Sequence, residues 1–200
     1  MKSPAFNFLL LALSFAIVIG TSSYFYAQSQ IRYEQQESRE QARYATEVAT
    51  QALRERLRVA AEDIVFLKSL TISSGVLEDS SERNRARLAQ HFSDYMRAHR
   101  SIAQLRWIDR NGVQQLRADY NDGDVTIEPR NQLQDKSQRP YVSYGLEMSE
   151  DEIYVPPLDL NIENGRIEVP HKPVIRFATP VFDSAGERRG LVVSNVLGRQ

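Results

Sequence analysis

The chain contains a long stretch that has no helix-breaking residue. No proline or glycine occurs between residues 28 and 71, where alanine, glutamine, glutamate and arginine are abundant. These residues have high helix propensity, whereas glycine and proline are the least compatible with a helix interior. The sequence therefore predicts one continuous helix, about 65 Å long at 1.5 Å per residue. Ser73-Ser74-Gly75 should end it.

Apolar residues in the second half of this stretch recur at alternating spacings of four and three residues. They are Leu53, Leu57, Ala60, Ile64 and Leu67. This spacing places them in one stripe along a helix, which predicts packing against a core. Residues 30–43 are polar almost all round, so this part needs a second helix or a second copy of the chain for stability. We therefore expect a stalk helix over residues 28–75 and a homodimer formed through it.

The segment before the stalk predicts a membrane anchor. Residues 4–27 contain no charged side chain, and a helix of this length reaches across a hydrocarbon core of about 30 Å. Tyr24-Phe25-Tyr26 stands at its end, where aromatic rings favour the headgroup level. Lys2 is the only cation before the segment, which places the N-terminus in the cytoplasm. We therefore assign residues 1–27 to the cytoplasmic N-terminus and the anchor.

A cleaved secretory signal is the alternative for this segment. Such a signal has small residues around its cleavage site, and Thr21 and Ser23 could serve. However, Tyr24-Phe25-Tyr26 follows directly and makes a poor start for a mature protein. Under either interpretation, the chain from Gln28 onward is delivered across a membrane.

Residues 76–200 have the pattern of an α+β domain with an antiparallel sheet. A helix is predicted from about Ser81 to His99, and a short helical or irregular stretch lies between Gln138 and Met148. Short runs rich in β-formers alternate with turn signals such as Asn111-Gly112 and Asn164-Gly165. The predicted strands are Ile102–Asp109, Val113–Ala118, Ile153–Val155, Arg166–Val169, Val174–Pro180 and Gly190–Val196.

Composition excludes several classes of function. The 25 basic and 26 acidic residues nearly balance, so no cationic excess exists to bind nucleic acid. The absence of cysteine excludes disulfides, thiolate metal sites and cysteine nucleophiles. The three histidines lack metal-ligand spacing, and residues 119–124 fit a turn better than a calcium loop. No nucleophile elbow or phosphate-binding loop occurs, so we expect no enzyme, metal or cofactor in these residues.

Cations, phenols and one carboxylate are concentrated between residues 135 and 176. Arginine matches a carboxylate with its planar fork, and tyrosine adds an orienting hydroxyl on an apolar ring. This mixture suits a small anionic or zwitterionic ligand in a concave pocket. The alternative is a set of solvent-facing side chains on strands. The cluster comprises Lys136, Arg139, Tyr141, Tyr144, Tyr154, Asp159, Lys172 and Arg176.

Four segments, residues 133–141, 153–161, 172–183 and 186–195, carry a resemblance to a known family. Pro157-Leu-Asp-Leu-Asn161 and the block from Lys172 to Asp183 are its most specific parts. The sequence resembles the Cache-type extracytoplasmic sensor domains of bacterial histidine kinases, diguanylate cyclases and chemoreceptors. The double-Cache domains of sensor histidine kinases are the most similar subgroup, over about residues 28–200.

The resemblance implies a PAS-like antiparallel sheet with a ligand pocket that a loop and a short helix close. Amino-acid-binding members grip the ligand carboxylate with an Arg-x-Trp-Tyr segment, and two acidic residues take the amine. Arg139 matches the arginine, but the tryptophan is missing; Asp159 matches the first acidic residue. Asn195 stands at the expected place of the second and lacks its charge, which favours a carboxylate or other small anion over an α-amino acid.

These observations predict the ligand-sensing module of a membrane-anchored bacterial signal transducer. The soluble part would lie in the periplasm or outside the cell, with the anchor in the inner membrane and any kinase or cyclase output outside these residues. The predicted ligand contacts are Lys136, Arg139, Tyr141, Tyr144, Tyr154, Asp159 and Asn195. Two alternatives remain: a membrane-anchored structural or dimerisation element without a ligand, and an anchored hydrolase, which would need a nucleophile–base pair.

Overall fold

The computed structural model describes residues 4–198, apart from positions 122, 164, 165, 168 and 170. The chain divides into two compact units, residues 1–55 and residues 56–200.

The first unit is formed by the N-terminal part of helix α1 (Pro4–Ser73). The helix ends where Ser73-Ser74-Gly75 predicts, and Gly75 has a positive φ of 77°. No helix in the described part of the chain is both long and apolar enough to span a membrane. The anchor predicted over residues 4–27 is therefore not confirmed.

The second unit is built on a six-stranded antiparallel sheet with the strand order β3-β2-β1-β8-β7-β4. A separate pair, β5 and β6, forms a small two-stranded sheet. This architecture confirms the predicted α+β class and antiparallel pairing. The elements are α2 (Glu82–Ala98), β1 (Ile102–Asp109), β2 (Gln114–Asn121), β3 (Asp124–Ile127), the 3-10 helix η1 (Arg130–Gln132), α3 (Pro140–Glu147), β4 (Asp159–Leu160), β5 (Ile162–Glu163), β6 (Arg166–Ile167), β7 (Pro173–Phe182) and β8 (Arg188–Leu197).

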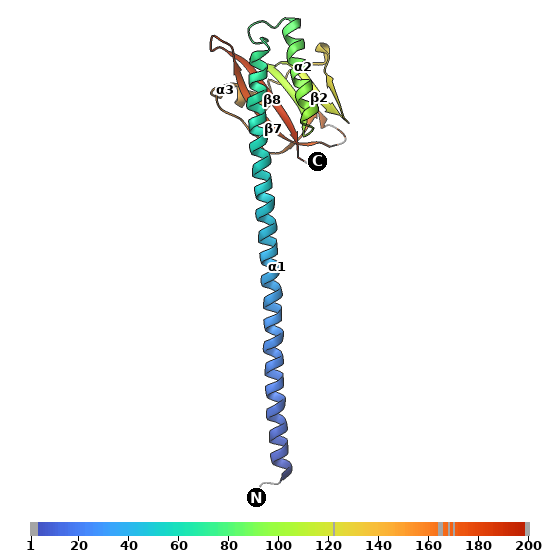
Figure 1. The fold of residues 1–200 in the computed structure, drawn as a ribbon, viewed down its shortest axis with the longest axis vertical. Helices are drawn as coiled ribbons and strands as arrows, with labels where there is room; N and C mark the ends of the chain where they lie inside the picture. Colours follow the sequence, from blue (N-terminus) through green and yellow to red (C-terminus); the bar gives the residue numbers. More distant parts are fainter. Residues whose placement is uncertain (1–3, 122, 164–165, 168, 170, 199–200) are drawn as a thin grey trace. The chain divides into compact units, whose positions relative to one another are not determined.

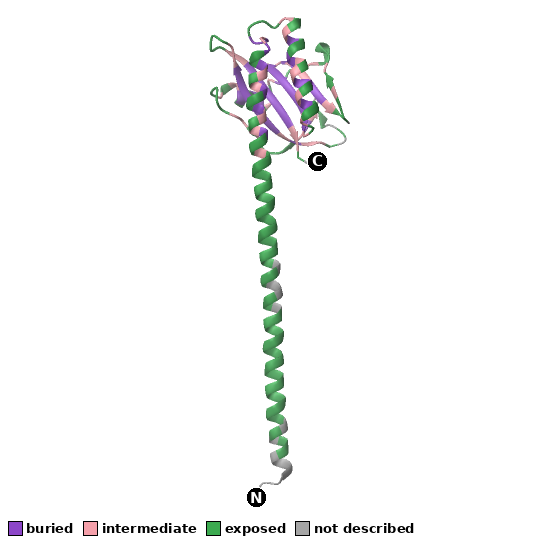
Figure 2. Ribbon diagram, viewed as in Figure 1, coloured by how far each residue is buried: buried purple, intermediate pink, exposed green. Residues whose placement is uncertain are grey.

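One face of the sheet is covered by α2 and by the part of α1 that belongs to the second unit (Figure 1). In Figure 2 the central strands of the sheet are purple, which shows that they are buried, whereas the edge strand β3 is mostly exposed. The predicted stripe on α1 packs here: Ala60, Ile64 and Leu67 are buried, whereas Leu53 is exposed. The strands supply Leu105, Trp107, Leu116, Phe177 and Val192 to the same core. We call this the apolar face.

The opposite face of the sheet carries α3 and a smaller apolar cluster. This cluster contains Ile108, Tyr141, Val142, Ala178, Leu191 and Val193. Because side chains alternate along a strand, the residues between those of the apolar face point to this side. Many of them are polar, so we call this the polar face.

Strands β1 and β8 approach each other closely at Gly190, which pairs with Asp109. Its φ is 139°, and a Cβ atom there would lie 1.9 Å from the carbonyl oxygen of Ile108. Only glycine fits this backbone conformation and this distance. Gly190 therefore allows the beginning of β8 to pack closely against the end of β1.

The observed strands differ from the predicted ones at three places. Ile153–Val155 forms no strand; Tyr154 makes only an isolated bridge to Ala178. The turn predicted after Asn121 is confirmed, because Asn121 pairs with Asp124 across it, but the strand β3 that follows it and β4 were not predicted. Each of these strands is two to four residues long, too short for a two-residue period to show in the sequence. Asn164-Gly165 and position 168 of the predicted strand 166–169 lie outside the described residues.

Candidate ligand-binding site

Four polar side chains form a continuous line across the polar face. Gln104 of β1 is the register partner of Asp119 on β2 and of Asn195 on β8, and Asn195 is also the partner of Arg176 on β7. Directly paired residues project their side chains to the same face of a sheet. All four are buried, with exposed fractions of 9% or less. We call Asp119, Gln104, Asn195 and Arg176 the polar row.

Hydrogen bonds connect each member of the polar row to the next. Arg176 Nε donates to Asn195 Oδ1 at 3.1 Å, and Asn195 Nδ2 donates to Gln104 Oε1 at 3.1 Å. Gln104 Nε2 then donates to Asp119 Oδ1 at 2.5 Å. Every bond runs from the guanidinium towards the carboxylate. The charged ends therefore fix the orientation of both amides, because each amide has its nitrogen on the carboxylate side.

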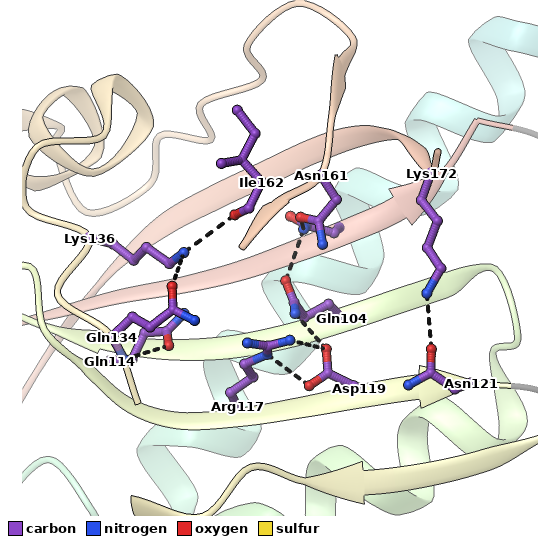
Figure 3. Close-up of polar contacts among 11 residues, drawn as sticks. Gln104, Gln114, Arg117, Asp119, Asn121, Gln134, Lys136, Asn161, Ile162 and Lys172 are labelled. Atoms are coloured by element: carbon purple, nitrogen blue, oxygen red, sulfur yellow. Dashed lines mark hydrogen bonds and ion pairs between the residues drawn. The ribbon is translucent and has the colours of Figure 1, made fainter. Parts of the chain in front are cut away.

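The carboxylate end of the row is held by a second contact. Arg117 binds both oxygens of Asp119, with Nε at 2.7 Å from Oδ2 and Nη2 at 3.1 Å from Oδ1 (Figure 3). Such two-point pairing is stronger and more directional than a single contact. Arg117 thus holds the Asp119 carboxylate in a fixed position on the polar face.

A cavity of about 140 Å³ opens beside this pair. A cavity of this volume has room for about five water molecules, or for a small molecule about as large as benzene. Arg117 and Lys172 bring positive charge to it, whereas Asp119 and Glu128 bring negative charge. The lining residues are Ala103, Gln104, Arg117, Asp119, Asn121, Thr126, Glu128, Asn161, Lys172, Val174 and Asn195. We call this the polar cavity.

The segment around β4 and β5 is attached to the polar face by side-chain contacts (Figure 3). Asn161 Oδ1 accepts a hydrogen bond from Asn195 Nδ2 at 3.2 Å, and Lys172 Nζ donates to Asn121 Oδ1 at 3.0 Å. These contacts lie at the wall of the cavity. A molecule that enters must therefore compete with them or add to them.

Arg176 occupies the other end of the polar row, next to α3. Its exposed fraction is 4%, and its guanidinium carbon lies 4.7 Å from the centre of the Tyr141 ring. Burial lowers the pKa of Arg176, and repulsion from Arg106 lowers it further. Tyr141 and Asp159 act in the opposite direction. This end of the row is therefore a buried positive centre.

The residues predicted from the sequence are distributed over three places. Within the described chain, Asn195 lies at the centre of the polar row and is the one predicted ligand contact that lines the polar cavity, together with Lys172 of the predicted cluster. Lys136 is buried nearby, where its Nζ donates to Gln134 Oε1 at 2.7 Å and to the carbonyl oxygen of Ile162 at 3.4 Å. Tyr141 faces Arg176, as described above.

The other four predicted residues lie further out. Arg139 Nη2 is 3.8 Å from Asp159 Oδ2, and both side chains are partly exposed. Tyr144 and Tyr154 form an aromatic pair with ring centres 5.6 Å apart, and Tyr144 is 57% exposed. The structure therefore brings Asn195, Tyr141 and Lys136 into the buried face and places the remaining four towards its rim.

Gln104, Arg117 and Asp119 were missed by the sequence analysis. A signal for them was present, because Leu116 and Ala118 alternate with Arg117 and Asp119 along one strand. This alternation places the charged pair on the face opposite the core. What the sequence did not show is that this second face is also covered.

The comparison with known protein families agrees with the resemblance that the sequence shows. The sequence model of the family "Bacterial histidine kinase, sensor domain" matches residues 28–197. No protein among the curated sequences matches the chain.

Two solved structures show the same fold, and a third is a weaker match. The domain of a sensory box/GGDEF family protein from Vibrio parahaemolyticus is 22% identical, with a TM-score of 0.57, and the match covers 72% of this chain and 58% of that one. The extracellular domain of the histidine kinase vpHK1S-Z8 gives the same identity, TM-score and coverage of this chain, and 55% of its own. The ligand-binding domain of the Pseudomonas aeruginosa PAO1 amino acid chemoreceptor PctC, in complex with GABA, is 16% identical with a TM-score of 0.49, covering 78% and 61%.

The chain thus spans between half and two thirds of the length of these solved domains. The family match covers most of the chain and includes every element of the sheet. The chain therefore belongs to the bacterial histidine kinase sensor domains, the class that its sequence resembles.

Proposed function

We propose that this chain is the small-molecule sensing module of a membrane-attached bacterial signal transducer, and that it binds an anionic or zwitterionic ligand in the polar cavity. The observation that carries the proposal is the cavity itself. It lies on the covered face of a sensor-domain sheet, and its walls present two cations, two carboxylates and several amides. Such a lining complements a molecule that bears charge. A purely structural or dimerisation element would need no cavity of this kind.

Ligand binding would act through differential affinity for two arrangements of the domain. A ligand shifts a conformational equilibrium only as far as it prefers one state over the other. The Asn161–Asn195 hydrogen bond joins the segment around β4 and β5 to β8. A ligand that replaces or reinforces this hydrogen bond would favour one position of that segment. On the opposite face, side chains of the same strands share one apolar core with Ile64 and Leu67 of α1. A small shift of β1 or β8 would thereby reach α1.

The family supports a sensing role, and no catalytic step is part of the proposal. Membrane attachment through residues 4–27, exposure of the domain outside the cytoplasm, and dimerisation through the stalk helix of residues 28–75 belong to the proposal as well. Any kinase or cyclase output would lie outside these residues. The direct ligand contacts predicted for Lys136, Arg139, Tyr141, Tyr144, Tyr154 and Asp159 stay predictions; Asn195 is the predicted contact that the cavity supports.

A thermal-unfolding screen of the full chain tests the proposal. Organic acids, amino acids and amines are added one at a time, and a ligand that binds the folded state raises the unfolding midpoint. Lys172→Ala should reduce this rise, because Lys172 lines the cavity. Arg97→Ala is the matched control, since Arg97 lies on the exposed side of α2 and pairs with Asp94. A screen without any stabilising compound, or equal responses of the Lys172 variant and the wild type, would contradict the proposal.

A further inference from the structure

A second feature of the polar face lies outside the polar cavity. Arg176 is a buried cation that the described chain satisfies only in part. A guanidinium carries five N–H donors, and one of them, on Nε, is used by Asn195. Among the described residues, no hydrogen bond or ion pair engages the two terminal nitrogens of Arg176. Its other contact is the face of the Tyr141 ring.

Tyr141 adds a second unused donor at the same place. It is 4% exposed, yet its hydroxyl has no hydrogen-bond partner within the described part of the chain. Neither this hydroxyl nor the terminal nitrogens of Arg176 are among the fully buried atoms without a partner in the described chain, so these donors keep some access to solvent. α3 holds Tyr141 close to the sheet, because Gly145 allows the helix to pack directly on Leu191. The ring is therefore fixed beneath the guanidinium.

The charges that act on Arg176 come from three neighbouring elements. Arg106 of β1 and Arg139, which precedes α3, disfavour its positive charge, whereas Asp159 of β4 favours it. Asp159 lies nearest to Arg139, at 3.8 Å, rather than to Arg176. An isolated buried charge is costly unless a counter-ion reaches it. Along the described chain, no carboxylate does so.

We propose that the terminal nitrogens of Arg176 and the hydroxyl of Tyr141 form a subsite for a carboxylate group. A planar carboxylate matches the guanidinium fork in two-point geometry, and a phenol donates a third hydrogen bond. The inference rests on the proposed sensing function, because it places the acidic end of the ligand. Asn195 belongs to both places, so the rest of such a ligand extends along the polar row towards the polar cavity. The ligand class is a carboxylic acid with a polar or charged tail.

Acetate is the probe for this subsite, because it carries the carboxylate and little else. The full chain is titrated with sodium acetate, with sodium chloride at matched ionic strength as reference, and thermal unfolding is followed. Acetate should raise the unfolding midpoint in a saturable way, whereas chloride should not. Arg176→Gln should weaken the apparent affinity for acetate by about tenfold or more, as expected when a charge-assisted contact is lost.

Arg188→Gln is the matched control for this variant. Arg188 also places its guanidinium over an aromatic ring, 4.8 Å from the centre of Phe182, and donates to a backbone carbonyl, that of Met148, at 2.7 Å. Its replacement should leave the acetate response unchanged. Tyr141→Phe keeps the ring beneath Arg176 and removes only the hydroxyl, so it decides the matter even if the Arg176 variant does not fold. It should weaken acetate by a factor of about three to ten.

Two results would overturn the subsite. One is an acetate response no larger than that of chloride; the other is a response that survives both Arg176→Gln and Tyr141→Phe unchanged. These failures differ from failure of the proposed function. A ligand whose effect needs Lys172 but not Arg176 removes the subsite and leaves sensing in place. If acetate binding needs Arg176 but no screened ligand stabilises the chain through Lys172, the subsite stands and the proposed function is contradicted.

Discussion

The two faces of the sheet are made by the same strands, but their chemistry differs. On the apolar face, Leu105, Trp107, Phe177 and Val192 pack against α1 and α2. On the polar face, their immediate neighbours in the chain include Gln104 and Arg176, which belong to a buried hydrogen-bonded row. A strand at the surface tolerates polar residues on its second side because water forms hydrogen bonds with them. Here that side is covered, so each polar group needs a partner in the protein or in a ligand.

This difference indicates that the two faces have different roles. Apolar burial contributes to stability without much directional demand, whereas a buried polar row is specific only if all its partners are present. The apolar face therefore accounts for the fold. The polar face, which contains the cavity and the partly satisfied Arg176, is where a bound molecule would change the balance of interactions.

The largest expected effect comes from a cavity on the apolar face. Phe177→Ala removes a ring that is 1% exposed, and such truncations cost about 3–5 kcal/mol of unfolding free energy. Urea unfolding monitored by Trp107 fluorescence measures the loss. Val155→Ala, at an exposed position, should change stability by less than about 0.5 kcal/mol. A loss below about 1 kcal/mol for Phe177→Ala would mean that the apolar face is not the main source of stability.

A smaller loss is expected at the centre of the polar row. Asn195→Leu keeps the approximate volume but leaves Arg176, Gln104 and Asn161 each without one hydrogen-bond partner. Unsatisfied buried groups cost about 1–3 kcal/mol, so the unfolding free energy should fall by that amount. Ser194→Ala is the matched control, because the neighbouring Ser194 hydroxyl is buried without a hydrogen-bond partner among the described residues. Equal losses in the two variants would contradict the role of the row.

The β7–β8 hairpin, outside both faces, should show a modest dependence of stability on pH. The Asp183 carboxylate accepts the backbone N–H of Glu187 at 2.9 Å, and Arg189 Nε lies 2.6 Å from it. These contacts hold the pKa of Asp183 below its usual value. Because the folded-state pKa is the lower one, the stabilisation is present above the unfolded-state pKa and is lost as pH falls through the folded-state pKa.

Asp183→Asn removes this titration. Urea unfolding between pH 6 and pH 2.5 should therefore show a flatter decline for the variant than for the wild type. If the two profiles instead run parallel over the whole range, Asp183 does not interact with its neighbours in solution and the prediction is wrong.

Long or repeated patterns made much of the fold predictable from the sequence. The helix limits near Ser73, the whole of α2 and the strand Ile102–Asp109 follow from propensity, breakers and turn residues. β3 and β4 were missed because two to four residues carry no readable period. β3 pairs locally with β2, whereas the pairing of β4 depends on longer-range contacts such as that of Leu160 with Pro173.

The site was predictable only in part, for a related reason. Asn195 was found through the resemblance, and Tyr141 and Lys136 through the concentration of cations and phenols around them. The cluster of residues 135–176 is contiguous in sequence, whereas Gln104 and Asp119 reach the site from strands paired across the sheet. Knowing that they join Asn195 requires the register, which sequence alone does not supply. Arg139 and Asp159 illustrate the opposite case, because they form a partly exposed pair at the rim.

The smallest expected effect on stability concerns the rim of the polar face. The same variant distinguishes a ligand bound at the aromatic rim from one bound in the polar cavity. Tyr144 is exposed and contacts Tyr154 in a tilted ring pair. Tyr144→Ala should lower the unfolding free energy by about 0.5–1 kcal/mol, since the pair is open to solvent. Because Tyr144 does not line the polar cavity, the stabilisation by a screened ligand should change less than twofold. Loss of that response with stability preserved would place the ligand at the aromatic rim, as the sequence pattern predicts, and away from the buried row.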